Sequence, residues 1–187
     1  MSHQNLWAPW RMQYVQQLDG SAATANEGDG SDCFLCAATA VTLGTDEARE
    51  HHVLVNDRRG LILLNRYPYT NGHLLIAPTQ HLADLSDLDS RQRLDLIDLV
   101  TLAEGLLRTA INPQGLNIGI NLGRCAGAGL PGHVHVHAVP RWNGDTNYMQ
   151  AIGCVRVIPQ ALEESYEQLA DTIKKLETGN PGRSAKP

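Results

Sequence analysis

The chain has 187 residues, a length that fits one domain with a hydrophobic core of ordinary size. Its net charge is −5 and its basic residues are scattered, so no basic stripe is available for a nucleic-acid backbone. No apolar run approaches the roughly 18 residues that cross a membrane, and the N-terminus lacks an apolar signal core. These features predict a cytoplasmic protein that binds neither nucleic acid nor membranes.

The first half of the chain predicts a flexible segment followed by strands. Residues 19–32 are small, polar and glycine-rich, and we expect a mobile loop there. Three short apolar runs, at 51–57, 59–66 and 71–78, are separated by turn residues. This spacing is typical of an antiparallel meander.

The second half predicts two helices and two further strands. Apolar residues of 90–110 repeat at helical spacing, with one face formed by Leu96, Leu99, Val100, Ala103, Leu107 and Ala110. Strands are expected at 115–123 and 133–140. A closing helix over 160–177 has an apolar face formed by Leu162, Tyr166, Leu169, Ile173 and Leu176. With a disordered tail at 178–187, residues 1–187 predict a single α+β domain.

Three histidines alternate with apolar residues in the last strand, HVHVHAVP. On a strand, His133, His135 and His137 share one face. The packed side then takes Val134, Val136, Ala138 and Val139. One alternative is three polar residues on a half-solvated strand, which the strict alternation disfavours. A shared metal site is also disfavoured, because the outer two Cα atoms should lie about 13 Å apart and zinc–nitrogen bonds are about 2 Å long.

A glycine-rich segment, NLGRCAGAGLPG, precedes these histidines at 121–132. Glycine permits backbone conformations that aim successive amides at a phosphate, and Arg124 adds a positive charge. Such a loop is more often only a turn, but beside a row of imidazoles it favours phosphoryl chemistry. An imidazole can attack phosphorus directly, while its neighbours stabilise the developing charge and assist the leaving group.

The strand matches the pattern His-φ-His-φ-His-φ-φ, where φ is apolar, and so resembles the histidine triad (HIT) family. Segments 63–88, 115–149 and 157–162 look like the bacterial branch that contains diadenosine polyphosphate hydrolases and phosphorylases. Segment 6–15 is similar to the N-terminal part of that branch. The resemblance implies a HIT-like fold, an antiparallel sheet with a long helix and a C-terminal helix. It also implies a homodimer whose two sheets join edge to edge.

The resemblance implies roles for individual residues. It makes His135, the central triad histidine, the nucleophile, and it places His137 against the phosphate and the leaving group. His73 matches a histidine that the family holds beside the triad. Asn65 matches a ribose-binding asparagine, and Asn121 an amide side chain against the scissile phosphate. Turn formation remains an alternative for Asn65, and an ordinary strand position for His73.

The loop before the triad departs from the family pattern. Arg124, Gly127 and Gly129 are expected to bind substrate phosphate. However, Ala128, Gly129 and Pro131 stand where many relatives carry glutamine, serine or threonine. Backbone amides, Arg124 or water are the candidates to replace the missing hydroxyl or amide group.

The cysteines raise a separate question, because only Cys33 and Cys36 lie close in sequence. A lone C-x-x-C is a zinc hook, a redox motif or a coincidence, and the four thiols are expected to be reduced. The resemblance includes zinc-bearing members of the superfamily, among them galactose-1-phosphate uridylyltransferases. It implies His81 and His133 as the two remaining ligands of a structural zinc.

The favoured function is a nucleotidyl hydrolase that cleaves dinucleoside polyphosphates, such as diadenosine tetraphosphate, through a covalent nucleotidyl-His135 intermediate. A phosphorylase with the same first step, and with phosphate as the acceptor, is one alternative. A nucleotide-binding or zinc-binding sensor without turnover is another, although a pure binder needs no nucleophile.

Overall fold

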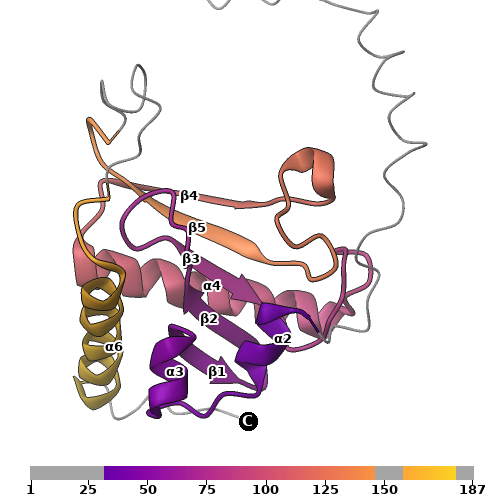
Figure 1. Cartoon of the computed structure of the whole chain (residues 1–187), viewed down its shortest axis with the longest axis horizontal. Coiled ribbons are helices and arrows are strands. Elements are labelled where there is room, and N and C mark those ends of the chain that lie inside the picture. The colour runs from indigo at the N-terminus through magenta and orange to yellow at the C-terminus, as the bar shows by residue number, and fades with distance from the viewer. Residues whose placement is uncertain (1–31, 146–157, 180–187) are drawn as a thin grey trace, which may run out of the picture.

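The computed structural model describes residues 32–145 and 158–179, and its centre is a five-stranded sheet (Figure 1). The strands are β1 (Val53–Asp57), β2 (Gly60–Leu64), β3 (Leu74–Ala77), β4 (Gly115–Ile120) and β5 (Val136–Arg141). They lie in the order β1-β2-β3-β5-β4, and every neighbouring pair is antiparallel. The predicted α+β class and antiparallel sheet are confirmed.

Both predicted helices are present. They are α4 (Ser90–Ile111) and α6 (Leu162–Gly179), and α4 begins with a capping box between Asp89 and Gln92. Two short helices that the sequence did not predict, α2 (Phe34–Thr39) and α3 (Asp46–Glu50), precede the sheet. None of the described helices combines the length and apolar character needed to span a bilayer.

Apolar layers cover both faces of the sheet. On one face, Ile62, Leu74, Ile76 and Val136 pack in a core with α4 and α6. On the other face, α2 contributes Leu35 and Ala38 to a second core, which the strands complete with Leu61, Leu63, Leu75 and Ala77. Because both faces are covered, every residue of β2 and β3 is buried, and these strands read as continuous apolar runs.

The turn before β3 places the first histidine of the site. Gly72 has a φ of +73° and leads directly into His73. The positive φ favours glycine, and a Cβ at Gly72 would also lie 2.6 Å from Ile111 Cδ1, so that side chain would have to move. The amide of Asn65 then donates to the carbonyl of His73 at 2.8 Å and closes the loop between β2 and β3.

The structure corrects three details of the prediction. Leu176 is 43% exposed, because the core face of α6 ends before the last turn. Thr178 and Gly179 belong to α6 instead of the predicted tail. Val139 lies on the same side of β5 as His137, because side chains alternate along the strand and Ala138 faces the core. Most of the predicted loop, the rest of the tail, segment 6–15 and residues 146–149 lie outside the described residues.

Candidate active site

The triad segment keeps strict alternation although β5 begins only at Val136. Val134 and Val136 are buried in the core beneath α4. The amide of Val134 donates to the carbonyl of Leu82 at 2.6 Å, which ties the segment before β5 to the loop after β3. On the opposite face, His133 is completely buried and His135 is 5% exposed. The first two histidines of the row are therefore packed in the interior, whereas His137 is half-buried.

The first triad histidine meets the cysteines. His133 Nδ1 lies 3.3 Å from Cys33 Sγ and 3.5 Å from Cys36 Sγ, and His81 Nδ1 lies 3.3 Å from Cys36 Sγ. The four ligand atoms all lie within 4.8 Å of one another. A tetrahedral zinc with ordinary bond lengths separates a sulfur from a nitrogen ligand by about 3.6 Å. The donor set and its spacing therefore fit a Cys2His2 metal site.

Burial and hydrogen bonding prepare His133 to act as a ligand. Its Nε2 lies 3.0 Å from the carbonyl of Pro78, which can only accept, so Nε2 carries the proton and Nδ1 presents a lone pair to the sulfurs. Burial lowers the pKa of His133 to about 4, which keeps the ring neutral. Burial and the neighbouring Cys33 raise the pKa of the Cys36 thiol to about 11, so metal binding at neutral pH must displace a proton.

The central triad histidine is oriented by backbone. His135 Nδ1 lies 2.8 Å from the carbonyl oxygen of His133. Since that oxygen accepts, Nδ1 holds the proton of the neutral ring and Nε2 keeps its lone pair. The His135 ring stands edge-on to the His137 ring, with centroids 5.0 Å apart. This arrangement leaves a nucleophilic nitrogen on His135 beside a second imidazole.

A chain of directed hydrogen bonds fixes the tautomer of His137. The amide of Tyr69 donates to His73 Nδ1 at 3.1 Å, so the proton of the neutral His73 ring is on Nε2. His73 Nε2 lies 2.9 Å from His137 Nδ1 and donates to it. The proton of His137 is consequently on Nε2, which is buried and has no hydrogen-bond partner within the described residues. Burial, with a smaller contribution from His135, lowers the pKa of His137 and favours this neutral donor.

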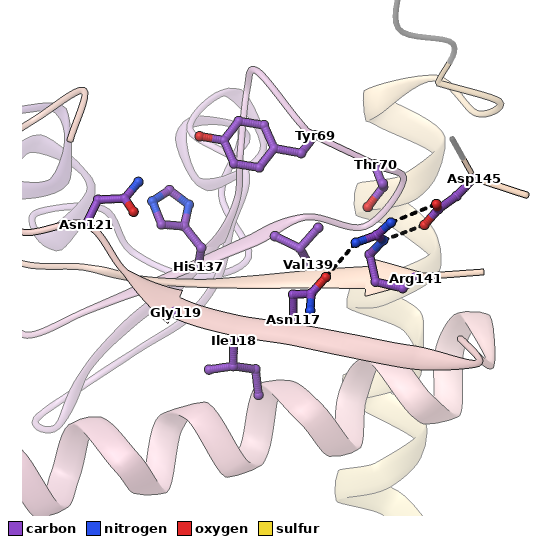
Figure 2. Close-up of a pocket in the computed structure, with 10 residues that line it drawn as sticks. All are labelled: Tyr69, Thr70, Asn117, Ile118, Gly119, Asn121, His137, Val139, Arg141 and Asp145. Carbon is purple, nitrogen blue, oxygen red and sulfur yellow. Dashed lines mark hydrogen bonds and ion pairs between the residues drawn. The ribbon is translucent and has the colours of Figure 1, made fainter. Parts of the chain in front are cut away.

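A cavity of about 440 Å³ opens beside His137 over the β4–β5 pair (Figure 2). Its floor and one wall come from β4, β5 and the residue after β4, and Tyr69 and Thr70 overhang it. Asn121 and His137 lie at one end, and Arg141 and Asp145 at the other (Figure 2). His137 therefore borders a space large enough for a small ligand, although its Nε2 atom is itself buried.

The structure separates the predicted substrate residues into two groups. Asn121 lines the cavity with His137. Asn65 instead accepts from the amide of Tyr67 at 2.9 Å and lies 3.3 Å from His73 Nδ1, an arrangement in which it braces the loop that holds His73. Its predicted contact with ribose stays a prediction.

The glycine-rich loop forms a short 3-10 helix, η1 (Arg124–Ala126). The amides of Ala126, Gly127 and Ala128 donate to carbonyls within the loop, at 2.9–3.3 Å, so they do not point outward as a phosphate nest. Asn121 Nδ2 lies 3.5 Å from the carbonyl of Gly127, and a Cβ at Gly129 would have no heavy atom within 4 Å. Arg124, Gly127 and Gly129 do not line the cavity.

Sequence reasoning missed several residues of the cavity. The most informative are Asn117, Gly119, Arg141 and Asp145. The period of two along Asn117, Gly119 and Asn121 could have revealed them, because the register pairs Gly119 with His137 and puts these positions on the triad face. Asp145 gave no such clue, since it follows a turn.

Comparisons with known proteins agree with this geometry. The HIT domain family model matches residues 46–144. The chain is 35% identical over 167 residues to the AP-4-A phosphorylase of Mycobacterium tuberculosis, across 89% of this chain and 83% of that protein. It also resembles the crystal structure of a Zn-bound histidine triad family protein from Mycobacterium smegmatis. That likeness has 27% identity and a TM-score of 0.62, over 79% of this chain and 97% of the other.

A third comparison concerns the fold alone. The diadenosine triphosphate hydrolase of Plasmodium falciparum superposes with a TM-score of 0.55 at 22% identity, over 66% of this chain and 77% of that one. The fold, the histidine row and these matches together place the chain in the HIT family. The prediction of a HIT-family enzyme is confirmed by the family match and by the extended likeness to a curated enzyme.

Proposed function

We propose that the protein cleaves dinucleoside polyphosphates by transferring a nucleotidyl group to His135. The observation that carries this proposal is the hydrogen bond from His135 Nδ1 to the carbonyl of His133, which leaves Nε2 as the free nucleophile. Such an arrangement is unnecessary for a protein that only binds nucleotides. His73 and His137 assist the reaction, and Asn121 contacts the scissile phosphate from the wall of the cavity.

The reaction proceeds in two displacements. His135 Nε2 attacks the α-phosphorus, and the bond from phosphorus to the bridging oxygen breaks with both electrons leaving on oxygen. His137 Nε2–H donates a hydrogen bond to that oxygen, and the polyphosphate leaves as an anion. The ring of His135 gains positive charge, which the carbonyl of His133 stabilises through Nδ1–H. Water then attacks phosphorus, the P–N bond breaks, its electrons return to Nε2, and the proton of water passes to solvent.

Phosphorolysis is the second candidate, because the M. tuberculosis relative is an AP-4-A phosphorylase. Inorganic phosphate would then replace water in the second displacement. The predicted phosphate residues Arg124, Gly127 and Gly129 would hold it only after the loop rearranges, because the Gly127 amide donates within the loop. Ala128 and Gly129 offer no side-chain hydroxyl for this task. We therefore retain hydrolysis as the principal reaction.

The products distinguish the two reactions. The protein should be incubated with diadenosine tetraphosphate, with and without inorganic phosphate. ATP and AMP at a rate independent of phosphate are expected from hydrolysis. ATP and ADP formed only with phosphate would establish phosphorolysis, and no product under either condition would contradict the proposal.

The Cys33–Cys36–His81–His133 cluster is proposed to hold a structural zinc. Its support is the ligand spacing and the second hydrogen bond that orients His133. With four protein ligands, a tetrahedral zinc has no open position for water or substrate. The metal would pin α2 onto the start of β5 and stabilise the triad segment.

A homodimer that joins two sheets edge to edge is also proposed. The support is that β4 ends the sheet with its outer edge unpaired by any strand of the described residues, and that Ile118 and Leu122 beside this edge are 45% and 41% exposed. Sedimentation equilibrium should give the mass of two chains.

A further inference from the structure

The cavity beside His137 is the feature that the proposed mechanism leaves largely unused. We propose that it binds the second nucleoside of the substrate, the one that departs with the leaving group. The inference rests on the proposed function, since it assumes nucleotidyl transfer to His135. It adds a subsite and names the residues that select for a nucleoside at the far end of the polyphosphate.

The position of the cavity follows from the direction of the displacement. His137 and Val139 line the cavity, whereas His135 does not, so it lies beyond His137 as seen from the nucleophile. The leaving group in an in-line displacement departs on the side opposite the attacking atom. His137 stands beside His135 and lines the cavity, so the leaving oxygen of the proposed displacement passes next to this residue. The part of the substrate beyond that oxygen is therefore directed over β4 and β5.

Gly119 forms the floor of the cavity beside His137, with which it pairs across the two strands. A Cβ at Gly119 would have no heavy atom within 4 Å, so the space above this residue is open. Its φ is not positive, and the strand conformation does not require glycine. Close approach of a ligand to the backbone is a common reason for glycine inside a strand.

The far wall of the cavity is the guanidinium of Arg141, whose orientation is fixed by hydrogen bonds. Arg141 donates to Asp145 through Nε at 2.5 Å and NH2 at 2.8 Å, and to Asn117 Oδ1 through NH1 at 2.7 Å (Figure 2). Asp145 balances its charge, and among the described residues no other lysine or arginine lines the cavity. This wall is poorly suited to a free polyphosphate, which needs unbalanced cations.

A nucleoside suits the same wall better. Nucleobases stack on guanidinium planes and on aromatic rings, and the ring of Tyr69, which is 43% exposed, overhangs the cavity. The volume of about 440 Å³ lies near the lower end of the range for small-molecule sites. It accommodates one nucleoside and excludes a whole dinucleoside polyphosphate.

Two substrates that differ only in the distal nucleoside test the inference. Diadenosine tetraphosphate and adenosine 5′-tetraphosphate present the same adenylyl group, but the second lacks the far adenosine. The wild-type kcat/KM should favour diadenosine tetraphosphate by about tenfold, as expected for one stacked base. Gly119→Val places its side chain in the cavity and should abolish this preference. The kcat/KM for adenosine tetraphosphate is the reference for this ratio in each variant, and Gly119→Ala should give an intermediate preference.

Ile120→Val is the matched control. Ile120 follows Gly119 in β4, but it faces the opposite side of the sheet, where Ala138 also lies, and it packs against the core. It should keep the full substrate preference. Equal wild-type kcat/KM for the two tetraphosphates would overturn the subsite and leave the proposed function intact. So would equal losses on both substrates in Gly119→Val. Failure of the wild type to cleave either compound would overturn the proposed function and the subsite with it.

Discussion

At His133 both ring nitrogens are occupied, one by the Pro78 carbonyl and the other by the cysteine thiols, and the ring is completely buried. At His137, four residues further along the same face, one nitrogen accepts from His73 and the other has no partner among the described residues, and the residue lines a cavity. One strand thus carries a closed site at one end and an open site at the other. The difference shows that a repeated residue type acquires separate roles through its second hydrogen bond.

His135, between these two ends, should give the largest effect on the reaction. His135→Ala removes the nucleophile, and kcat for diadenosine tetraphosphate should fall at least about 10³-fold. Nucleotide binding, measured by calorimetry, should remain, because the cavity lies beyond this residue. Activity within tenfold of the wild type would contradict covalent catalysis.

Loss of the closed site should affect stability more than chemistry. Protein with Cys33→Ser and Cys36→Ser should contain no zinc, whereas the wild type should hold about one per chain by elemental analysis. We expect Tm to fall by about 10 °C or more, and kcat to fall less than tenfold. Cys125→Ser is the matched control, since this thiol is exposed and is not a member of the cluster. Metal-free wild-type protein of unchanged stability would refute the zinc proposal.

The tautomer of His137 can be tested with two replacements for His73. Glutamine presents an amide N–H near the position of Nε2, and asparagine presents an oxygen near the position of Nδ1. His73→Gln retains the donor to His137 and should lower kcat less than about tenfold, whereas His73→Asn loses that donor and should lower kcat about 100-fold. Equal kcat values for the two variants would show that His73 does not act through His137.

The smallest expected effect is on the pH dependence of stability. The folded pKa of His137 is lowered, so the unfolded chain binds more protons as the pH falls below about 6.5, and stability decreases there. His137→Asn removes this titrating group. The free energy of unfolding that is lost between pH 7.5 and pH 5.5 should therefore be smaller in this variant, by under about 1 kcal/mol. Urea unfolding of zinc-loaded protein at both pH values measures it. The same loss of unfolding free energy in the variant and the wild type would mean that folding does not lower the pKa of His137.

Periodicity was sufficient to predict much of the fold. The alternation of Val134 and Val136 with the histidines, and the helical spacing of Leu96, Leu99 and Ala103, each reflect one buried face. Helix α2 was missed because six residues give too short a pattern, and its position depends on the Cys33 cap and on contacts with β2. Leu176 was misassigned because the neighbouring core ends before α6 does.

The candidate site was predictable where its residues share a motif and less so where the fold brings them together. His73 and His137 are 64 residues apart, and their hydrogen bond depends on the β3–β5 pairing, which the sequence does not state. The bonding of the Ala126–Ala128 amides within their own loop could not be read from glycine content. Arg141 and Asp145 form a pair that sequence spacing alone does not distinguish from a turn.

The covalent intermediate on His135 is the central claim, and mass spectrometry tests it most directly. Protein mixed with excess diadenosine tetraphosphate should be quenched in base within one turnover, because the P–N bond is labile in acid, and then digested. The peptide that carries His135 should gain the mass of one adenylyl group, and the His135→Ala protein should show no such gain. Full turnover without an adduct, or an adduct on His133 or His137, would contradict the account.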